Sequence, residues 1–223
     1  MTEKEFMERG FMEAYSRIFI NNVYSFDKVT LLKSMRESQI RTFGWPIGIV
    51  MDNPQAPAAY EAGIKCKLLY ENSFDYWTLK KNGDFYFLGS YFEDMGNKPG
   101  LIFYDSRINR ITETIMRIGK LYELLGIPKK EVIEFKIRHT GLKERRLSVA
   151  NTIRWLYGDR VCKAANEAET ELKIELDDMT SLGTVQESVF KIMKELMENF
   201  DFFVPDKGDV YRTVEQFTRG QIV

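Results

Sequence analysis

Cysteine and histidine are scarce in this chain. Its 223 residues include 2 cysteines, Cys66 and Cys162, and 1 histidine, His139. Two separated cysteines and one histidine exclude a disulfide framework and a Cys/His zinc site. We therefore expect neither a bound metal nor a cofactor.

Long apolar runs and a charge excess are also missing. No apolar run approaches the roughly 20 residues that a membrane-spanning helix needs, and residues 1–5 carry no signal-peptide pattern. Lys and Arg total 32 against 33 for Asp and Glu, a net charge of −1, so the bulk charge does not indicate a nucleic-acid binder. We expect a protein of the cytoplasm with no membrane contact.

Apolar and aromatic residues are plentiful. Hydrophobic residues make up 44% of the chain and aromatic residues 13%, which is typical of a globular protein with a large packed core. The length suits one large domain or two small ones. No internal repeat and no low-complexity tract is present.

The N-terminal 41 residues have a helical pattern. Residues 3–22 carry apolar residues at three- and four-residue steps, which predicts a helix. A second helix is predicted over 26–40, with Ser25 as its N-cap. We expect residues 1–41 to form a helical arm or subdomain.

Strand patterns follow from residue 44 onward. Residues 44–51 form a β-rich run, and 64–70 alternate between apolar and polar side chains. The best hairpin joins 75–80 to 85–91, and Asn82-Gly83 predicts a two-residue type I′ turn.

The C-terminal half mixes helices and strands. A short strand at 101–104 precedes a helix at 106–125, and further strands are predicted at 132–140 and 170–177. A capping box, Thr184 with Glu187, predicts the start of another helix. The apolar stripe of the 106–125 helix repeats at steps of three and four and comprises Ile108, Ile111, Ile115, Ile118, Tyr122 and Leu125.

One-sided strands combined with amphipathic helices predict an α+β fold. We expect a mixed, largely antiparallel sheet with helices packed on one face. This domain covers residues 42–205, after the N-terminal helical segment and before a C-terminal tail at 206–223.

The strongest charge feature is a basic run at 136–146. It supplies the candidate ligand-binding residues Arg138, His139, Lys143, Arg145 and Arg146. Arginine matches phosphate geometry, so the run is a candidate nucleic-acid contact. The alternative is a solvated basic turn that pairs with the acidic stretch at 167–178, for example Lys136 and Arg138 with Glu171 and Glu175.

Two further candidate sets are three arginines on the 106–125 helix and a group of aromatic residues near predicted turns. Arg107, Arg110 and Arg117 fall within about one quadrant of that helix. They could form an anion-binding groove, and the alternative is an ordinary solvated helix face. Trp45, Tyr76 and Trp77 are candidates for stacking on a planar ligand or base, although core anchoring of the hairpin is favoured for at least one of Tyr76 and Trp77, because adjacent strand residues face opposite sides.

Five short runs in this order are similar to a known family: GWPIG at 44–48, FDYW at 74–77, FYDSRI at 103–108, HTGL at 139–142 and FDFF at 200–203. Over about residues 30–205 the chain resembles the C-terminal region of bacterial and archaeal Schlafen/Alba-type DNA-binding proteins, some of them ATP-binding. About 40 residues precede Gly44, too few for that family's N-terminal Alba-like domain. The resemblance therefore implies an accessory region without the DNA-binding part, and no catalytic residue is carried over.

Three functions are open on this reading. The first is a non-enzymatic sensing or partner-binding accessory module, a regulatory subunit that the resemblance links to DNA transactions or defence. Its partner would be a separate Alba-like subunit or a second copy of the chain. The second is direct nucleic-acid binding through the basic run and the arginine-bearing helix. The third, ranked last, is a hydrolase-type enzyme using Asp75, Asp94 or Asp105 with His139.

Overall fold

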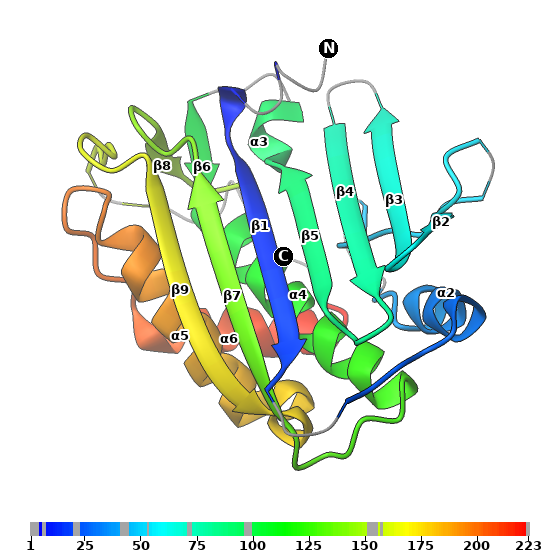
Figure 1. The fold of residues 1–223 in the computed structure, drawn as a ribbon. Coiled ribbons are helices and arrows are strands. Elements are labelled where there is room, and N and C mark those ends of the chain that lie inside the picture. The colour runs from blue at the N-terminus through cyan, green and yellow to red at the C-terminus, as the bar shows by residue number, and fades with distance from the viewer. Residues whose placement is uncertain are drawn as a thin grey trace.

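The computed structural model describes residues 5, 8–19, 23–40, 45–52, 54–70, 73–95, 100–150, 156 and 158–221. Within these residues the chain forms a seven-stranded sheet, a two-stranded sheet and a layer of helices (Figure 1).

All neighbouring strands of the large sheet are antiparallel, in the order β2-β3-β4-β5-β1-β7-β9. Its strands are β1 Phe11–Ile18, β2 Ala58–Tyr60, β3 Gly63–Tyr70, β4 Ser73–Lys80, β5 Phe85–Ser90, β7 Val132–Thr140 and β9 Glu167–Glu175. The small sheet pairs β6, Leu101–Phe103, in parallel with β8, Arg146–Ser148.

The helices α4, α5 and α6 cover one face of the large sheet and leave the other face toward the viewer in Figure 1. The helices are α2 Lys28–Glu37, α3 Phe92–Met95, α4 Tyr104–Leu124, α5 Leu182–Met197 and α6 Lys207–Thr218, and a 3₁₀ helix spans Leu176–Thr180. We call the helix-covered side the inner face and the opposite side the outer face.

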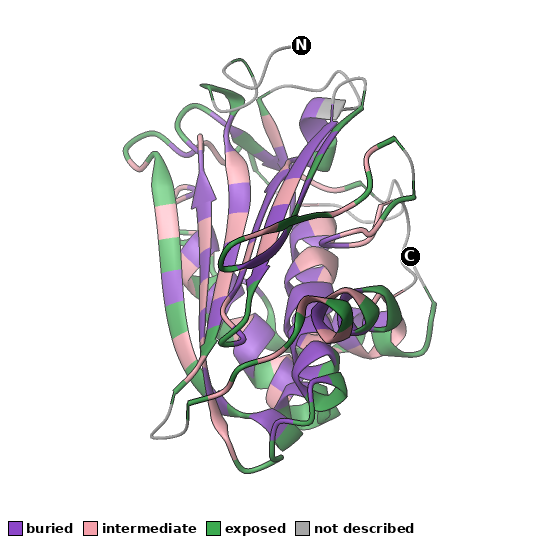
Figure 2. Cartoon of the chain, turned by 45° about the vertical axis from the view of Figure 1, so that its right-hand side comes forward, coloured by how far each residue is buried: buried purple, intermediate pink, exposed green. Residues whose placement is uncertain are grey.

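The core lies between the inner face and α4. Burial alternates along the strands, as Figure 2 shows, because successive side chains of a strand point to opposite faces. All six residues of the expected α4 stripe, from Ile108 to Leu125, are buried. The α+β fold, the largely antiparallel sheet and the one-sided helix layer are thereby confirmed.

The expected helix over 3–22 is wrong, because residues 11–18 form β1 between β5 and β7. The spacing of Phe11 and Tyr15 fits one face of a helix, but four is an even number, so the two also share a face of a strand. Both faces of β1 carry apolar or aromatic side chains, which hides the two-residue period. This stretch is a middle strand of the main sheet and not part of a separate arm.

The hairpin 75–91 is confirmed, but its turn is of another type. Gly83 has a φ of 93° and Asn82 is not among the residues with positive φ. The Gly83 amide donates to the Lys80 carbonyl and the Lys80 amide donates to the Asp84 carbonyl. This is a three-residue connection with glycine in the left-handed position, which needs only one positive φ.

Several boundaries also differ from the expectation. The run at 45–51 is a loop, and Gly44 lies outside the described residues. Helix α2 is capped by Asp27, whose carboxylate accepts from the Val29 and Thr30 amides, and not by Ser25. Helix α5 begins at Leu182, before the expected capping box.

The C-terminal segment is not a tail. Residues 207–218 form α6, which buries Val210, Val214 and Phe217 against the helical layer. The strand expected at 170–177 lies a few residues earlier in the chain. It is β9, Glu167–Glu175, and the 3₁₀ helix follows it directly.

Candidate functional site

A buried charge cluster closes one end of the inner face. The ring of Tyr91, just after β5, contacts two guanidinium groups, whose central carbons lie 4.9 Å (Arg107) and 4.8 Å (Arg145) from the ring centroid. Arg107 pairs with Glu93 of α3 at 3.1 Å, and Arg145 makes two hydrogen bonds to Asp94 at 2.9 and 2.6 Å. Both arginines are buried, so this cluster joins α3, α4 and the turn before β8 and does not face solvent.

His139 belongs to the same cluster. It points inward from β7 and stacks on Tyr91, with ring centroids 6.3 Å apart and planes 9° apart. Burial, together with the positive charge of Arg107, lowers the pKa of His139 to about 3. The imidazole is therefore neutral near pH 7 and enclosed by protein, which is the environment of a structural histidine.

Asp75 and His139 lie in one cross-strand row of the inner face, which we call the inner row. Gly89 of β5 and Met12 of β1 lie between them in this row. Burial raises the pKa of Asp75 to about 7, and the positive charge of Arg110 opposes that shift. Beside it is a cavity of about 20 Å³ under Trp45. A space of that size holds a water molecule and no larger ligand.

The two other arginines of α4 secure the loop at 45–51. Arg110 donates to the Trp45 carbonyl at 2.6 Å and to Glu113 at 2.9 Å. Arg117 is 1% exposed and donates to the carbonyls of Met35 and Gly48, at 3.1 and 2.8 Å. Burial lowers the pKa of Arg117 to about 10, so it keeps its charge and binds backbone oxygen. These arginines do not form a solvent-facing anion groove.

The two tryptophans of the expectation differ in burial, since Trp77 lies in the core and Trp45 is half-buried. Trp77 is fully buried, and its indole nitrogen donates to the Ile49 carbonyl at 2.9 Å. Trp45 packs against the ring of Tyr70, with centroids 5.4 Å apart. The alternative of core anchoring therefore describes Trp77.

Two of the three carboxylates of the enzyme hypothesis, Asp94 and Asp105, accept hydrogen bonds within the fold. Asp94 is paired with Arg145, and Asp105 accepts from the amides of Ser106 and Ala150, both at 2.9 Å. Within the described residues no group of three or more His, Cys, Asp or Glu side chains is placed to hold a metal ion.

The basic run divides between the interior and the outer face. Lys136 pairs with Glu169 and Glu171, at 2.8 and 2.7 Å, and Arg138 pairs with Glu167 and Glu13. The expected cross-strand pairing with β9 is therefore present, but Glu175 instead binds Lys130. At the turn, Lys143 and Arg146 are exposed, and Arg146 pairs with Asp159 at 3.0 Å.

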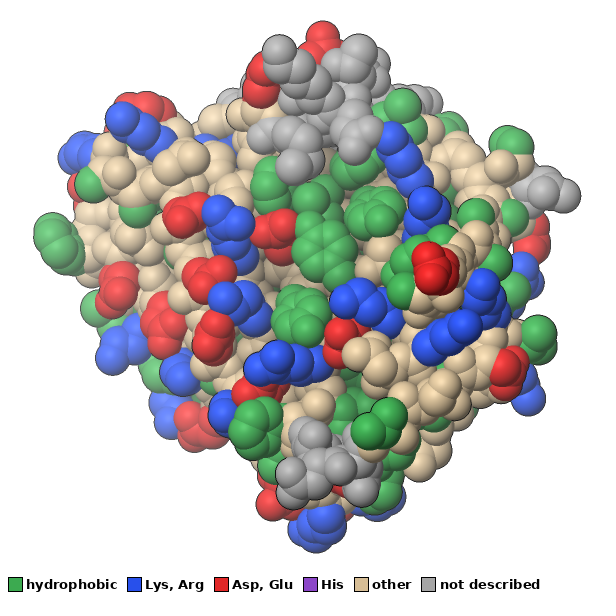
Figure 3. Space-filling view, viewed as in Figure 1, with side chains coloured by type: hydrophobic (Ala, Val, Ile, Leu, Met, Phe, Trp, Pro, Cys, Tyr) green, Lys and Arg blue, Asp and Glu red, His purple; other side chains and the backbone are tan. Residues whose placement is uncertain are grey.

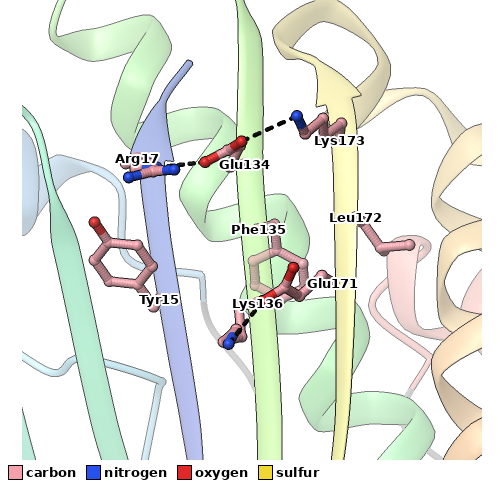
Figure 4. A pocket seen from close by; sticks show the side chains of 8 residues that line it. All are labelled: Tyr15, Arg17, Glu134, Phe135, Lys136, Glu171, Leu172 and Lys173. Carbon is pink, nitrogen blue, oxygen red and sulfur yellow. Dashed lines mark hydrogen bonds and ion pairs between the residues drawn. The ribbon is translucent and has the colours of Figure 1, made fainter.

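Within the described residues, helices α4, α5 and α6 cover only the inner face of the large sheet, and the outer face carries none of them. It carries a shallow hollow of about 550 Å³ over β1, β7 and β9 (Figure 4). One row of charges crosses the hollow, where Glu134 binds both Arg17 and Lys173, and a second ion pair joins Lys136 to Glu171.

Aromatic side chains occupy the middle of this face, as Figure 3 shows. On β1, β4 and β5 the cluster has Phe74 and Leu88 buried at its centre, with the half-buried Phe11, Tyr76 and Tyr86 packed against them. The Tyr86 hydroxyl donates to Glu13 at 2.5 Å, and Tyr15 is the cross-strand neighbour of Tyr86. The face thus combines aromatic area with paired charges.

Of the candidate residues, Lys143 and Arg146 are exposed at the turn into β8, and Arg138 lies half-buried on the outer face. Tyr76 is a stacking candidate in the sequence, but no local pattern indicates that Tyr15, Tyr76 and Tyr86 lie on the same face of one sheet. A strand assignment for residues 11–18 was the signal needed, because only the β1 register places Tyr15 beside Tyr86.

Comparisons with protein-family models, curated proteins and solved structures find no match for this chain. The resemblance to Schlafen/Alba-type proteins therefore stays a sequence-based prediction. In the described part of the chain, no helix is long and apolar enough to cross a bilayer.

Proposed function

We propose that this protein is a non-enzymatic partner-binding module and that its contact surface is the outer face of the large sheet. The observation that carries the proposal is the one-sided helix layer, which within the described residues covers the inner face and leaves half-buried tyrosines and charged side chains on the outer face (Figures 1 and 3). Tyrosine and arginine side chains are enriched in protein interfaces, where they supply contact area together with hydrogen bonds.

The charge pattern of this face favours a protein partner over a nucleic acid. Lys136 and Arg138 are already bound to glutamates of β1 and β9. A phosphate would have to displace those carboxylates. Arg107, Arg117 and Arg145 are buried and bound internally, so they supply no phosphate contact either. Paired charges of both signs are complementary to the mixed charges of a protein surface.

The test is affinity capture from a lysate of the source cell, with the wild type and a Tyr15→Ala/Tyr86→Ala double variant as baits. We expect a protein retained by the wild type to be lost, or bound at least about tenfold more weakly, by the double variant. Tyr211→Ala is the matched control, because Tyr211 is a half-buried tyrosine of α6 on the helical side. Equal retention by both baits would contradict the proposal.

A nucleic-acid titration at about 150 mM salt distinguishes the proposed protein partner from the alternative of direct nucleic-acid binding. Micromolar binding of the wild type that is lost in Lys143→Glu/Arg146→Glu would favour the nucleic-acid function. Under the proposal, the wild type binds oligonucleotides no better than that variant does.

A further inference from the structure

We infer that the partner of the outer face is a second copy of this chain, packed face to face about a two-fold axis parallel to the strands. This inference rests on the proposed function, since it names the occupant of the same surface. Two observations carry it. The charge of the outer face differs between its two sides, and the strand register aligns opposite charges when a second copy packs face to face on the first.

The two flanks of the outer face differ in charge. Strand β3 presents Lys65 and Lys67, whose ammonium groups lie over the rings of Tyr60 and Phe74. Strand β9 presents an excess of glutamates, and two of these, Glu169 and Glu171, share the ammonium of Lys136. Figure 3 shows apolar side chains between the two flanks. The face is therefore positive on one side, apolar in the middle and acidic on the other side.

The register places these residues in two rows that run straight across six strands. The first row, in strand order from β3 to β9, is Lys65, Thr78, Tyr86, Tyr15, Lys136 and Glu171. The second row, in the same order, is Lys67, Tyr76, Leu88, Glu13, Arg138 and Glu169. Each row begins with a lysine and ends with a glutamate.

A two-fold axis parallel to the strands, between β5 and β1, reverses the order of each row in the second copy. Lys65 then faces Glu171 of the second copy, and Lys67 faces its Glu169. In the middle, Tyr86 faces Tyr15 of the second copy. An isologous interface repeats every such contact twice.

The same operation places Tyr76 opposite Arg138 of the second copy, a geometry suited to a cation–π contact. The other in-plane axis, perpendicular to the strands, would place lysine flank on lysine flank and glutamate flank on glutamate flank. Like charges opposite one another disfavour that arrangement, so the charge pattern selects one of the two.

The area of the outer face determines the dimer affinity that we expect. Six strands span about 24 Å, and the outward residues of β1 span about 20 Å along the strands. Two twisted sheets pack with their strands within about 30° of each other, which keeps the central rows in contact. A footprint of this size is at the small end of specific interfaces, so we expect a dimer with a micromolar dissociation constant.

The test is a charge exchange followed by sedimentation velocity. We expect the wild type to dimerise between about 1 and 200 µM, and both Lys65→Glu/Lys67→Glu and Glu169→Lys/Glu171→Lys to dimerise at least tenfold more weakly. Mixing the two variants restores both sets of contacts, one with reversed signs and one with the native signs, so the mixture forms a 1:1 heterodimer. Lys120→Glu/Lys194→Glu, which reverses exposed lysines on the helical side, leaves the wild-type dimer unchanged.

A second pair of variants covers the case in which a charge-reversed chain does not fold. Lys65→Cys and Glu171→Cys chains, mixed under mild oxidation, form an intermolecular disulfide that neither chain forms alone. The native Cys66 and Cys162 are buried and do not compete.

A wild type that remains monomeric at about 200 µM, or a mixture that gives neither heterodimer nor disulfide, overturns the second copy as partner. That result leaves the proposed function intact if lysate capture still depends on Tyr15 and Tyr86. If capture is also independent of these tyrosines, the proposed function fails as well.

Discussion

The two faces of the large sheet use the same kinds of charged residue in opposite ways. On the inner face, Arg145 and Asp94 form an ion pair whose side chains are 6% and 3% exposed. On the outer face, Arg138 and Glu167 form a pair whose side chains are 37% and 58% exposed. A buried charge must keep its partner, whereas an exposed charge can exchange its partner for water or for another protein. The inner pair is therefore fixed within the fold, whereas the outer pair is free to exchange partners.

The largest expected effect comes from breaking the buried pair. Arg145→Met leaves the Asp94 carboxylate without its two hydrogen bonds in the interior, so we expect a loss of about 3–5 kcal/mol in the free energy of unfolding. The matched outer-face change, Arg138→Met, removes exposed pairs and is expected to cost under about 1 kcal/mol. Urea unfolding followed by tryptophan fluorescence measures both, and equal losses would remove the distinction between the faces.

Asp75 gives the next largest effect, and it depends on pH. Its pKa is about 7 in the folded protein against an ordinary value of 3.8, so between these values the folded state binds more protons than the unfolded state. The wild type therefore loses stability as pH rises from about 4 to 7. Asp75→Asn lacks this loss, so its stability relative to wild type should rise by about 2–4 kcal/mol from pH 4 to pH 8.

The outer-face control for this effect has the opposite sign. Arg17 and Lys173 lower the pKa of Glu134 below its ordinary value, so its stabilising contribution is present at neutral pH and is lost on acidification. Glu134→Gln should be less stable than wild type at pH 8 and should approach it in acid. The Glu134 contribution is lost only below the ordinary glutamate pKa of 4.5. Melting temperatures measured from pH 8 down to about pH 2.5 therefore cover both variants, and parallel curves for Asp75→Asn and wild type would refute the buried-carboxylate account.

A smaller effect tests how tightly the inner face is packed. A Cβ atom on Gly89 would lie 2.5 Å from the Phe87 ring and 2.7 Å from an Asp75 carboxylate oxygen. We expect Gly89→Ala to cost about 1–3 kcal/mol. Thr78→Ala, on the neighbouring strand but on the outer face, should cost less than about 1 kcal/mol. Thermal unfolding compares the two, and a neutral Gly89→Ala would mean that the inner row has spare room.

The smallest effect separates the faces by salt dependence. Lys136→Gln removes the cation that Glu169 and Glu171 share, which we expect to cost under about 1 kcal/mol at low salt. At about 0.5 M salt this loss should vanish because exposed charges are screened. The Arg145→Met loss should persist there, and an equal salt response in both variants would argue against a dry inner cluster.

The elements that the sequence predicted best are those with one apolar side. Helix α4 and strand β7 each bury a regular stripe, so local periodicity alone located them. Strand β1 was misread because both of its faces carry apolar side chains. Helix α6 was missed as a tail, although its burial of Val210, Val214 and Phe217 follows helical spacing.

The candidate site was harder to predict, because a basic residue looks the same in sequence whether it is buried or exposed. Arg107, Arg117 and Arg145 were interpreted as surface charges, yet their partners lie 14, 69 and 51 residues away. Nothing local to an arginine indicates a carboxylate or carbonyl at such a distance.

By itself the sequence determined the fold class and most individual elements, since hydrophobic periodicity within a segment decides which of its sides is buried. Only the tertiary structure decided that β1 lies between β5 and β7 and that lysines of β3 and glutamates of β9 fall in common rows. Strand order and register depend on contacts between distant segments, and a one-residue shift would move every side chain to the opposite face. The outer surface of this protein is therefore a property of the assembled sheet and not of any one segment.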